Sequence, residues 1–273
     1  MSNLRWPPVI ARATEIVLSY DTGVTLRQLF YRLVSAQILP NTMNVYKSLS
    51  DRTAALRRQG LFPDLVEAGR PIHQLPCWDS PADAWADWTE NYWRVDRTAG
   101  QDVNLWVATE KSGLVRQLSS WFGDLDVPIV AFSGYASVTL EKDAASRVDA
   151  DGRPAVLLYA GDFDPTGEDI DRVFVENTAC WAKVIRVALN ADQVDDYGLP
   201  ENPGKTTDSR AKAFAARHGR LCQVEMDALD PTDLRALFQD AIDPFWDTSA
   251  YDRAMAREGE GRADLERLAG GLR

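Results

Sequence analysis

The chain has 273 residues, of which 45% are hydrophobic and 26% are charged. This length suits one large domain or two ordinary ones, and the composition excludes a disordered, collagen-like or low-complexity chain. No apolar run approaches the ~18 residues that a membrane helix needs, and the first residues lack the apolar core of a secretory signal. We therefore expect a folded cytoplasmic protein with no membrane partner.

The net charge of −11 argues against a generic nucleic-acid-binding protein, but the charges are unevenly distributed. Residues 1–75 carry nine basic and five acidic side chains, whereas residues 76–273 carry 21 basic and 36 acidic ones. Three cysteines without a CxxC pair and only two histidines suggest neither a disulfide framework nor a zinc site. Any bound metal should therefore be held by carboxylates.

The front of the chain has the pattern of short helices with tight connections. Apolar periodicity predicts helices over residues 9–18, 25–37 and 43–59, the second with Thr25 as its N-cap. Residues 61–76, which are interrupted by prolines and a glycine, predict short extended pieces. Three helices followed by a small β excursion favour a winged helix-turn-helix over residues 1–78.

A connecting helix and a parallel sheet are predicted for the rest of the chain. An amphipathic helix over 80–95, within a connecting segment 79–100, places Trp85, Trp88 and Tyr92 on one stripe. Apolar runs then alternate with helical stretches, as in a parallel sheet with crossover helices over residues 101–273. The predicted strands are 103–108, 127–132, 155–160 and 184–189; the predicted helices are 113–122, 137–147 and 168–180; and 199–205 is a predicted loop.

Acidic residues follow two of the predicted strands. The segment AVLLYAGDFDPTGEDI places Asp162 and Asp164 after one strand, and NLWVATEKSGL places Glu110 after another. Ligands bind at the carboxyl ends of strands in open α/β sheets, so these three carboxylates should lie on one rim. Oxygen ligands of this kind suit Mg²⁺, with Mn²⁺ as a substitute. The sequence therefore predicts a magnesium site.

Other interpretations of the same segment remain open. Asp164 would cap the next helix, with Pro165 in its first turn, while Asp162 is simply solvated. A calcium-binding EF-hand loop fails, because the position that requires a glutamate is Val173. The Asp-x-Asp-x-Thr pattern also resembles the nucleophile loop of haloacid-dehalogenase-type phosphatases, in which Asp162 would be the nucleophile and Asp164 the acid/base.

A tyrosine in the second predicted helix lies away from its apolar stripe. Tyr31 is not an obvious core residue, and Arg27 lies four residues earlier on the same face. A fixed positive charge favours the phenolate and holds a phosphate, which a tyrosine nucleophile needs. The simpler interpretation is that Tyr31 stacks on Arg27.

The third predicted helix has basic residues opposite its apolar face. Lys47 and Arg58 would meet DNA phosphates if this helix is a recognition helix. An ordinary solvated face explains them equally well, and Asp51 on the same side weakens the DNA interpretation.

Taken together, these segments resemble the A subunit of topoisomerase VI and the related meiotic double-strand-break transesterase, in the short stand-alone A-type form. That family carries Arg-x-x-(Phe/Tyr)-Tyr in a winged helix, matched here by Arg27 and Phe30-Tyr31. It then carries a Toprim domain with a glutamate after its first strand and Asp-x-Asp-Pro-x-Gly after a later one. Glu110 and Asp162-Phe-Asp164-Pro-Thr-Gly match these motifs in order.

The resemblance implies a Mg²⁺-dependent transesterase that cleaves double-stranded DNA. Tyr31 would form a 5′-phosphotyrosyl link, Arg27 would position the phosphate, and Glu110, Asp162 and Asp164 would bind the metal. A homodimer is implied, in which the tyrosine of one protomer works with the acidic cluster of its partner. The chain has no Gly-rich nucleotide loop, so ATP-driven strand passage would require a separate ATPase subunit.

Three rival functions remain: a hydrolytic Toprim nuclease, the phosphatase, and a non-catalytic DNA-binding scaffold. The segment from Val224 to Pro231 has no assigned chemistry. Its Glu225 and Asp227 would extend the acidic rim, although edge-strand and capping roles are the simpler expectation.

Overall fold

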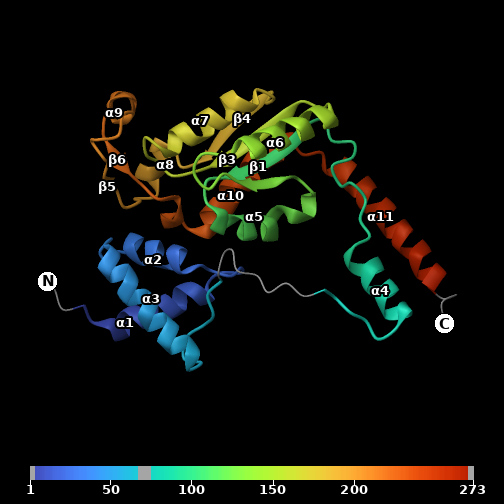
Figure 1. Cartoon of the computed structure of the whole chain (residues 1–273), viewed down its shortest axis with the longest axis horizontal. Helices are drawn as coiled ribbons and strands as arrows, with labels where there is room; N and C mark the ends of the chain where they lie inside the picture. The colour runs from blue at the N-terminus through green and yellow to red at the C-terminus, as the bar shows by residue number, and fades with distance from the viewer. Residues whose placement is uncertain (1–3, 67–74, 270–273) are drawn as a thin grey trace.

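The computed structural model describes residues 4–66 and 75–269, and its first part is a group of three helices (Figure 1). These helices are α1 (Trp6–Leu18), α2 (Leu26–Ser35) and α3 (Met43–Arg58). Their apolar faces form one buried cluster that includes Ala13, Leu29, Phe30, Leu33 and Leu49. The three predicted helices are thus confirmed, each with its apolar face inward.

A capping box fixes the start of α2. The Thr25 hydroxyl accepts a hydrogen bond from the Gln28 backbone N–H, and the Gln28 side chain accepts one from the Thr25 backbone N–H at 2.9 Å. These contacts satisfy backbone donors that a helix end otherwise leaves unpaired. The predicted N-cap at Thr25 is confirmed, and the cap sets the position of Arg27 in the first turn.

The β part of the predicted winged helix is not observed in the described residues. The described parts of 61–76, which are 61–66 and 75–76, form no strand, and residues 67–74 lie outside the described chain. One backbone hydrogen bond, from the Val66 N–H to the Val24 carbonyl, ties the segment to the helices. Pro63 lacks the N–H that a ladder position needs.

The second part is a four-stranded parallel sheet with the order β2-β1-β3-β4. Its strands are β1 (Asn104–Thr109), β2 (Ile129–Ala131), β3 (Ala155–Ala160) and β4 (Lys183–Ala188). Alternate residues of β3 enter the cores on opposite faces, as Leu158 and Tyr159 do. Helices α5 (Val115–Phe122) and α10 (Pro231–Ile242) cover one face, and α6 (Val138–Asp151) and α7 (Gly167–Thr178) cover the other. The predicted parallel sheet is confirmed.

The remaining elements follow β4 or lie beside the sheet. Residues 202 and 203, inside the predicted loop 199–205, form a short antiparallel ladder with residues 222 and 223, a non-local pairing that local composition does not reveal. None of the described helices is long and apolar enough to cross a membrane. The elements outside the three-helix group and the four-stranded sheet with its covering helices are α4 (Pro81–Asn91), α8 (Ala191–Asp196), β5 (Asn202–Pro203), α9 (Ala211–His218), β6 (Cys222–Gln223), α11 (Thr248–Ala269) and the 3₁₀ turns Ser112–Leu114, Gly123–Leu125, Met226–Ala228 and Asp243–Phe245.

Helix α4 lies beside the C-terminal helix α11, away from the sheet (Figure 1). The indole N–H of Trp85 donates to the Leu265 carbonyl at 3.1 Å, and that of Trp93 donates to the Glu258 carbonyl at 3.1 Å. Of the predicted aromatic stripe, Trp88 and Tyr92 remain exposed. The connecting segment is therefore attached to α11 through Trp85 and Trp93.

A buried ion pair joins this connection to α11. The Arg97 guanidinium donates from Nη2 to Glu258 Oε1 at 2.8 Å and from Nε to Oε2 at 3.1 Å, and both side chains are buried. The hydrogen bonds from Arg97 lower the pKa of Glu258. Replacing Glu258 by a neutral residue would leave the charge of Arg97 buried without the carboxylate that balances it.

We expect Glu258→Gln to lower the free energy of unfolding by about 3 kcal/mol near pH 7. A carboxyl whose folded-state pKa is depressed stabilises the fold above its unfolded pKa of about 4.3, and that stabilisation is lost as the pH falls further. The deficit of the variant should therefore shrink below about pH 4. Urea unfolding of the wild-type protein and the Glu258→Gln variant across pH measures this deficit, and Glu260→Gln, at an exposed position of α11, is the control. Equal deficits for the two variants would contradict the role of Glu258 in a buried ion pair.

Candidate functional site

The two central strands deliver acidic side chains to the same edge of the sheet. The chain leaves β1 for β2 on one side and returns to β3 on the other, so the carboxyl ends of β1 and β3 lie at a topological switch point. The Glu110 N–H donates to the Ala160 carbonyl at 2.9 Å, and the Asp162 N–H donates to Glu110 Oε2 at 3.1 Å. The structure thus brings these two predicted residues together.

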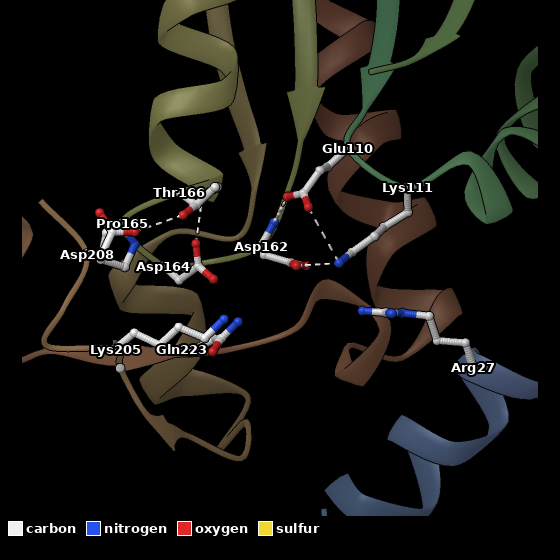
Figure 2. Close-up of a pocket in the computed structure, with 12 residues that line it drawn as sticks. Arg27, Glu110, Lys111, Asp162, Asp164, Pro165, Thr166, Lys205, Asp208 and Gln223 are labelled. Atoms are coloured by element: carbon white, nitrogen blue, oxygen red, sulfur yellow. Dashed lines mark hydrogen bonds and ion pairs between the residues drawn. The ribbon is translucent and has the colours of Figure 1, made fainter. Parts of the chain in front are cut away.

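A polar cleft of about 270 Å³ lies at this edge. Figure 2 shows Glu110, Asp162 and Asp164 along one side of it, with Lys205 and Gln223 facing them from another segment. Arg27, from α2, lies at one end of the cleft. The cleft is thus built from both parts of the chain.

The ammonium group of Lys111 lies among the carboxylates. It pairs with Asp162, with Glu225 Oε2 at 2.9 Å and with Glu110 Oε1 at 3.6 Å. Burial alone would lower the pKa of Lys111, but these three carboxylates outweigh burial and raise it. Lys111 therefore remains charged and balances part of the negative charge. This role of Lys111 was not predicted from the sequence, although Lys111 directly follows Glu110, just after the end of β1.

Asp162 is buried rather than solvated. Its side chain is covered by the segment before α10, where its Oδ1 accepts the Met226 backbone N–H at 2.9 Å. Burial raises the pKa of Asp162 well above its ordinary value, Lys111 lowers it, and the charges of Glu110 and Glu225 raise it further. The expectation of a simply solvated Asp162 is therefore wrong, because a segment more than 60 residues later in the chain covers it.

Asp164 supports the start of α7. Its Oδ1 accepts the Gly167 backbone N–H at 2.7 Å, so Asp164 satisfies one backbone donor in the first turn, close to the alternative capping role, although the N-cap position itself is Thr166. A Cβ atom at position 167 would lie 2.2 Å from the Asp162 carbonyl oxygen, so this close approach requires glycine. The spacing of the Asp162–Gly167 motif thus has a local structural reason.

The donor set fits a hard cation, but the carboxylates do not converge on one point. In residues 4–66 and 75–269, no group of three or more acidic, histidine or cysteine side chains is close enough together to hold a metal ion. The Lys111 ammonium lies between Asp162 and Glu110, and Asp164 is engaged by Gly167. Three carboxylates lining one cleft supply the oxygen ligands that Mg²⁺ prefers, and Lys111 would have to give way.

Ion pairs attach α2 to the acidic edge. Arg27 Nη2 lies 2.6 Å from Glu225 Oε2, and its Nε lies 3.1 Å from Asp227 Oδ2. In the next turn of α2, Arg32 pairs with Asp230. Glu225 and Asp227 were expected to serve as edge or capping residues, but their side chains bind Arg27 across 198 and 200 residues of sequence.

Tyr31 lies half-buried beside Arg27, whose guanidinium carbon is 5.3 Å from the centre of the phenol ring. It lines a separate small cavity with Arg27, Phe30, Thr42 and Tyr46, so Arg27 borders both cavities. Burial raises the pKa of Tyr31 to about 12, Glu225 adds to this rise, and Arg27 opposes it. Arg27 thus acts in favour of the phenolate, as the sequence indicates, but burial and Glu225 outweigh it, so the phenol stays protonated in the free protein.

Lys47 and Arg58, the predicted DNA-binding residues, are exposed on α3. Neither lines the acidic cleft, and Asp51 is exposed on the same helix. The structure therefore does not bring them together with the carboxylates.

No protein-family model matches this chain, and a search of curated proteins finds no match. The site itself is an acidic sheet edge whose charge is partly balanced by Lys111 and Arg27, with Tyr31 next to Arg27.

We expect Lys111→Met to lower the free energy of unfolding by about 3 kcal/mol at neutral pH, because it removes the cation that balances buried carboxylates. Without Lys111 the pKa of Asp162 should rise further. A carboxyl with a raised folded-state pKa destabilises the fold above that pKa, and protonation relieves this as the pH falls toward about 4. The deficit should therefore be smaller at pH 5 than at pH 8.

Chemical unfolding at the two pH values measures this difference. Lys142→Met, at an exposed position of α6, is the matched control. A deficit that is independent of pH, or equal in the two variants, would contradict a charge-balancing role for Lys111.

Proposed function

We propose that the protein is a Mg²⁺-dependent, DNA-cleaving transesterase with Tyr31 as its nucleophile. The observation that carries the proposal is the position of Arg27, which borders the Tyr31 cavity and binds the acidic edge of the sheet. Arg27 pairs with Glu225 and Asp227, and it lines the same cleft as Glu110, Asp162 and Asp164, the carboxylates of the Toprim-like motifs. The order of those motifs and their resemblance to the topoisomerase VI A subunit support the same function.

Glu110, Asp162 and Asp164 would hold the metal ion, and Mn²⁺ should substitute for Mg²⁺. When bound, such an ion offsets negative charge on the phosphoryl oxygens and on the leaving oxygen. Arg27 supplies a fixed guanidinium that orients the phosphate by paired hydrogen bonds. For this, Arg27 must exchange Glu225 and Asp227 for the phosphate oxygens.

In the proposed step, the phenolic oxygen of Tyr31 attacks the phosphorus atom of the DNA backbone. The new bond joins the tyrosine oxygen to the 5′-phosphate, and the bond from phosphorus to the 3′ oxygen breaks. The tyrosine proton passes to solvent water as the bond forms, and the leaving 3′ oxygen takes a proton from solvent water to become a hydroxyl. Because burial and Glu225 keep the phenol protonated in the free protein, the approach of cationic groups is needed to activate it. Two protomers acting together would cut the two strands.

A phosphatase is the second candidate, because of the contact between Lys111 and Asp162. An ammonium beside a buried carboxylate would attract a small phosphoester to Asp162. In that case Tyr31 would have no role, and DNA would not be needed.

The proposed function requires a covalent intermediate between Tyr31 and DNA that denaturation can trap. Wild-type protein, incubated with supercoiled and end-labelled DNA in Mg²⁺ or Mn²⁺ and then denatured with detergent, should retain protein on 5′ DNA ends. Tyr31→Phe should abolish this adduct, whereas Tyr92→Phe, at an exposed position after α4, should preserve it. The wild-type protein should be tested alone and with any co-purifying ATPase subunit.

Each other result selects a different function. DNA cleavage without an adduct would establish the hydrolytic nuclease. A covalent phosphate on Asp162 and hydrolysis of a small phosphoester without DNA would establish the phosphatase. DNA binding that is unaffected by Tyr31→Phe and Asp162→Asn, with no cleavage, would leave the binding scaffold.

The proposed function also requires that the folded protein bind Mg²⁺ at Asp162. Millimolar Mg²⁺ should raise the melting temperature of the wild-type protein by a few degrees, because a ligand that binds only the folded state stabilises it. Asp162→Asn should lose this rise, whereas Asp240→Asn, at an exposed position of α10, should keep it. An equal rise in all three proteins would contradict a site at Asp162.

A further inference from the structure

The wall of the cleft opposite the carboxylates includes the short antiparallel ladder of β5 and β6, which are separated in the chain by α9. Asn202 and Pro203 of β5 pair with Gln223 and Cys222 of β6. Gly204 follows β5 directly, and a Cβ atom there would lie 2.7 Å from Leu221 Cγ, so the backbone at Gly204 lies close against that side chain. This packing holds the next residue, Lys205, at the border of the cleft.

Two side chains at this ladder, Lys205 just after β5 and Gln223 of β6, face the cleft. Figure 2 shows the Lys205 ammonium and the Gln223 amide directed into it, below Asp164. Arg27 lies at the other end of the row of carboxylates in the same view. The cleft is therefore bordered by cationic groups at both ends and by acidic groups between them.

The two ends differ in how their charges are balanced. Arg27 is bound by Glu225 and Asp227. By contrast, none of the ion pairs formed within the described chain includes Lys205, which is exposed. An exposed ammonium on an acidic protein can bind an external anion without first breaking an internal ion pair. Lys205 is thus the cation of the cleft that is available to a ligand.

We propose that Lys205, together with Gln223, binds a second backbone phosphate of the DNA strand that lies along the cleft, at the opposite end of the row of carboxylates from the phosphate at Arg27. This inference rests on the proposed function and adds a second phosphate contact to it. The ammonium supplies charge and the amide supplies hydrogen-bond donors, a combination that suits a phosphodiester oxygen. A linear polyanion fits the arrangement, because it presents phosphates to both ends of the cleft at once.

The test measures binding of a short DNA duplex to Tyr31→Phe protein in Mg²⁺ by fluorescence anisotropy over a range of salt concentrations. Each phosphate contact contributes about 0.9 to the slope of log K against log salt concentration. Adding Lys205→Met should weaken binding roughly tenfold and lower the magnitude of that slope by about 0.9. Lys205→Arg should retain the slope, and Gln223→Ala should weaken binding without changing it, because the amide is neutral. Lys142→Met is the control and should change neither quantity.

The outcomes separate this inference from the proposed chemistry. A slope that stays unchanged in Lys205→Met, while the duplex still binds, would overturn the phosphate contact and leave the transesterase intact. A lowered slope in the binding test, together with no covalent adduct on wild-type protein in the trapping experiment, would support the contact and remove Tyr31 as nucleophile. If Tyr31→Phe protein binds no duplex at any salt concentration, both the Lys205 phosphate contact and the DNA-cleaving function are wrong.

Discussion

Two cations and four carboxylates form ion pairs where α2 contacts the carboxyl edge of the sheet, and the site depends on how their charges balance. The cations are Lys111 and Arg27, and the carboxylates are Glu110, Asp162, Glu225 and Asp227. Glu225 accepts from both Lys111 and Arg27, so it joins the cation of the sheet to the cation of the helix. Burial and opposing charge act differently on each carboxyl: Lys111 and Arg27 lower the pKa of Glu225 despite its burial, whereas burial raises that of Asp162. A buried charge without a partner is costly, so the helical part and the sheet part hold each other in place.

The topology of the sheet explains why the acidic edge exists. Because β1 and β3 are neighbours and the chain turns in opposite directions from them, the loops after both strands open onto one crevice. Cores on both faces of the sheet fix the strands, and the Gly167 contact fixes the loop after β3. The positions of Glu110 and Asp162 are therefore set by backbone packing, although Lys111 would have to leave the space between their side chains before both could bind one ion.

Features that depend on local sequence are the ones that could be predicted. The Thr25 capping box, the inward face of α3 and the alternating strands follow from propensity and periodicity, and the strand-end positions of Glu110 and Asp162 follow from the parallel pattern. The pairing of Arg27 with Asp227 spans 200 residues, and no local pattern encodes it. The protonation of Tyr31 is non-local for the same reason: the sequence indicates the effect of the nearby Arg27, which lowers the pKa, but not burial or the distant Glu225, which outweigh it.

An acidic protein that binds a polyanion must offset its own charge at the point of contact. Here the offset is divided: Lys111 and Arg27 are occupied by internal carboxylates, and Lys205 is exposed. A divalent cation among Glu110, Asp162 and Asp164 would take over the balancing role of Lys111 and release its ammonium toward an incoming phosphate. Metal and phosphate would then favour each other's binding, and linkage requires that the effect be reciprocal. Under the proposed function, a bound divalent cation would reduce the negative charge of the cleft where a phosphate binds, so the net charge of −11 would not by itself prevent DNA binding there.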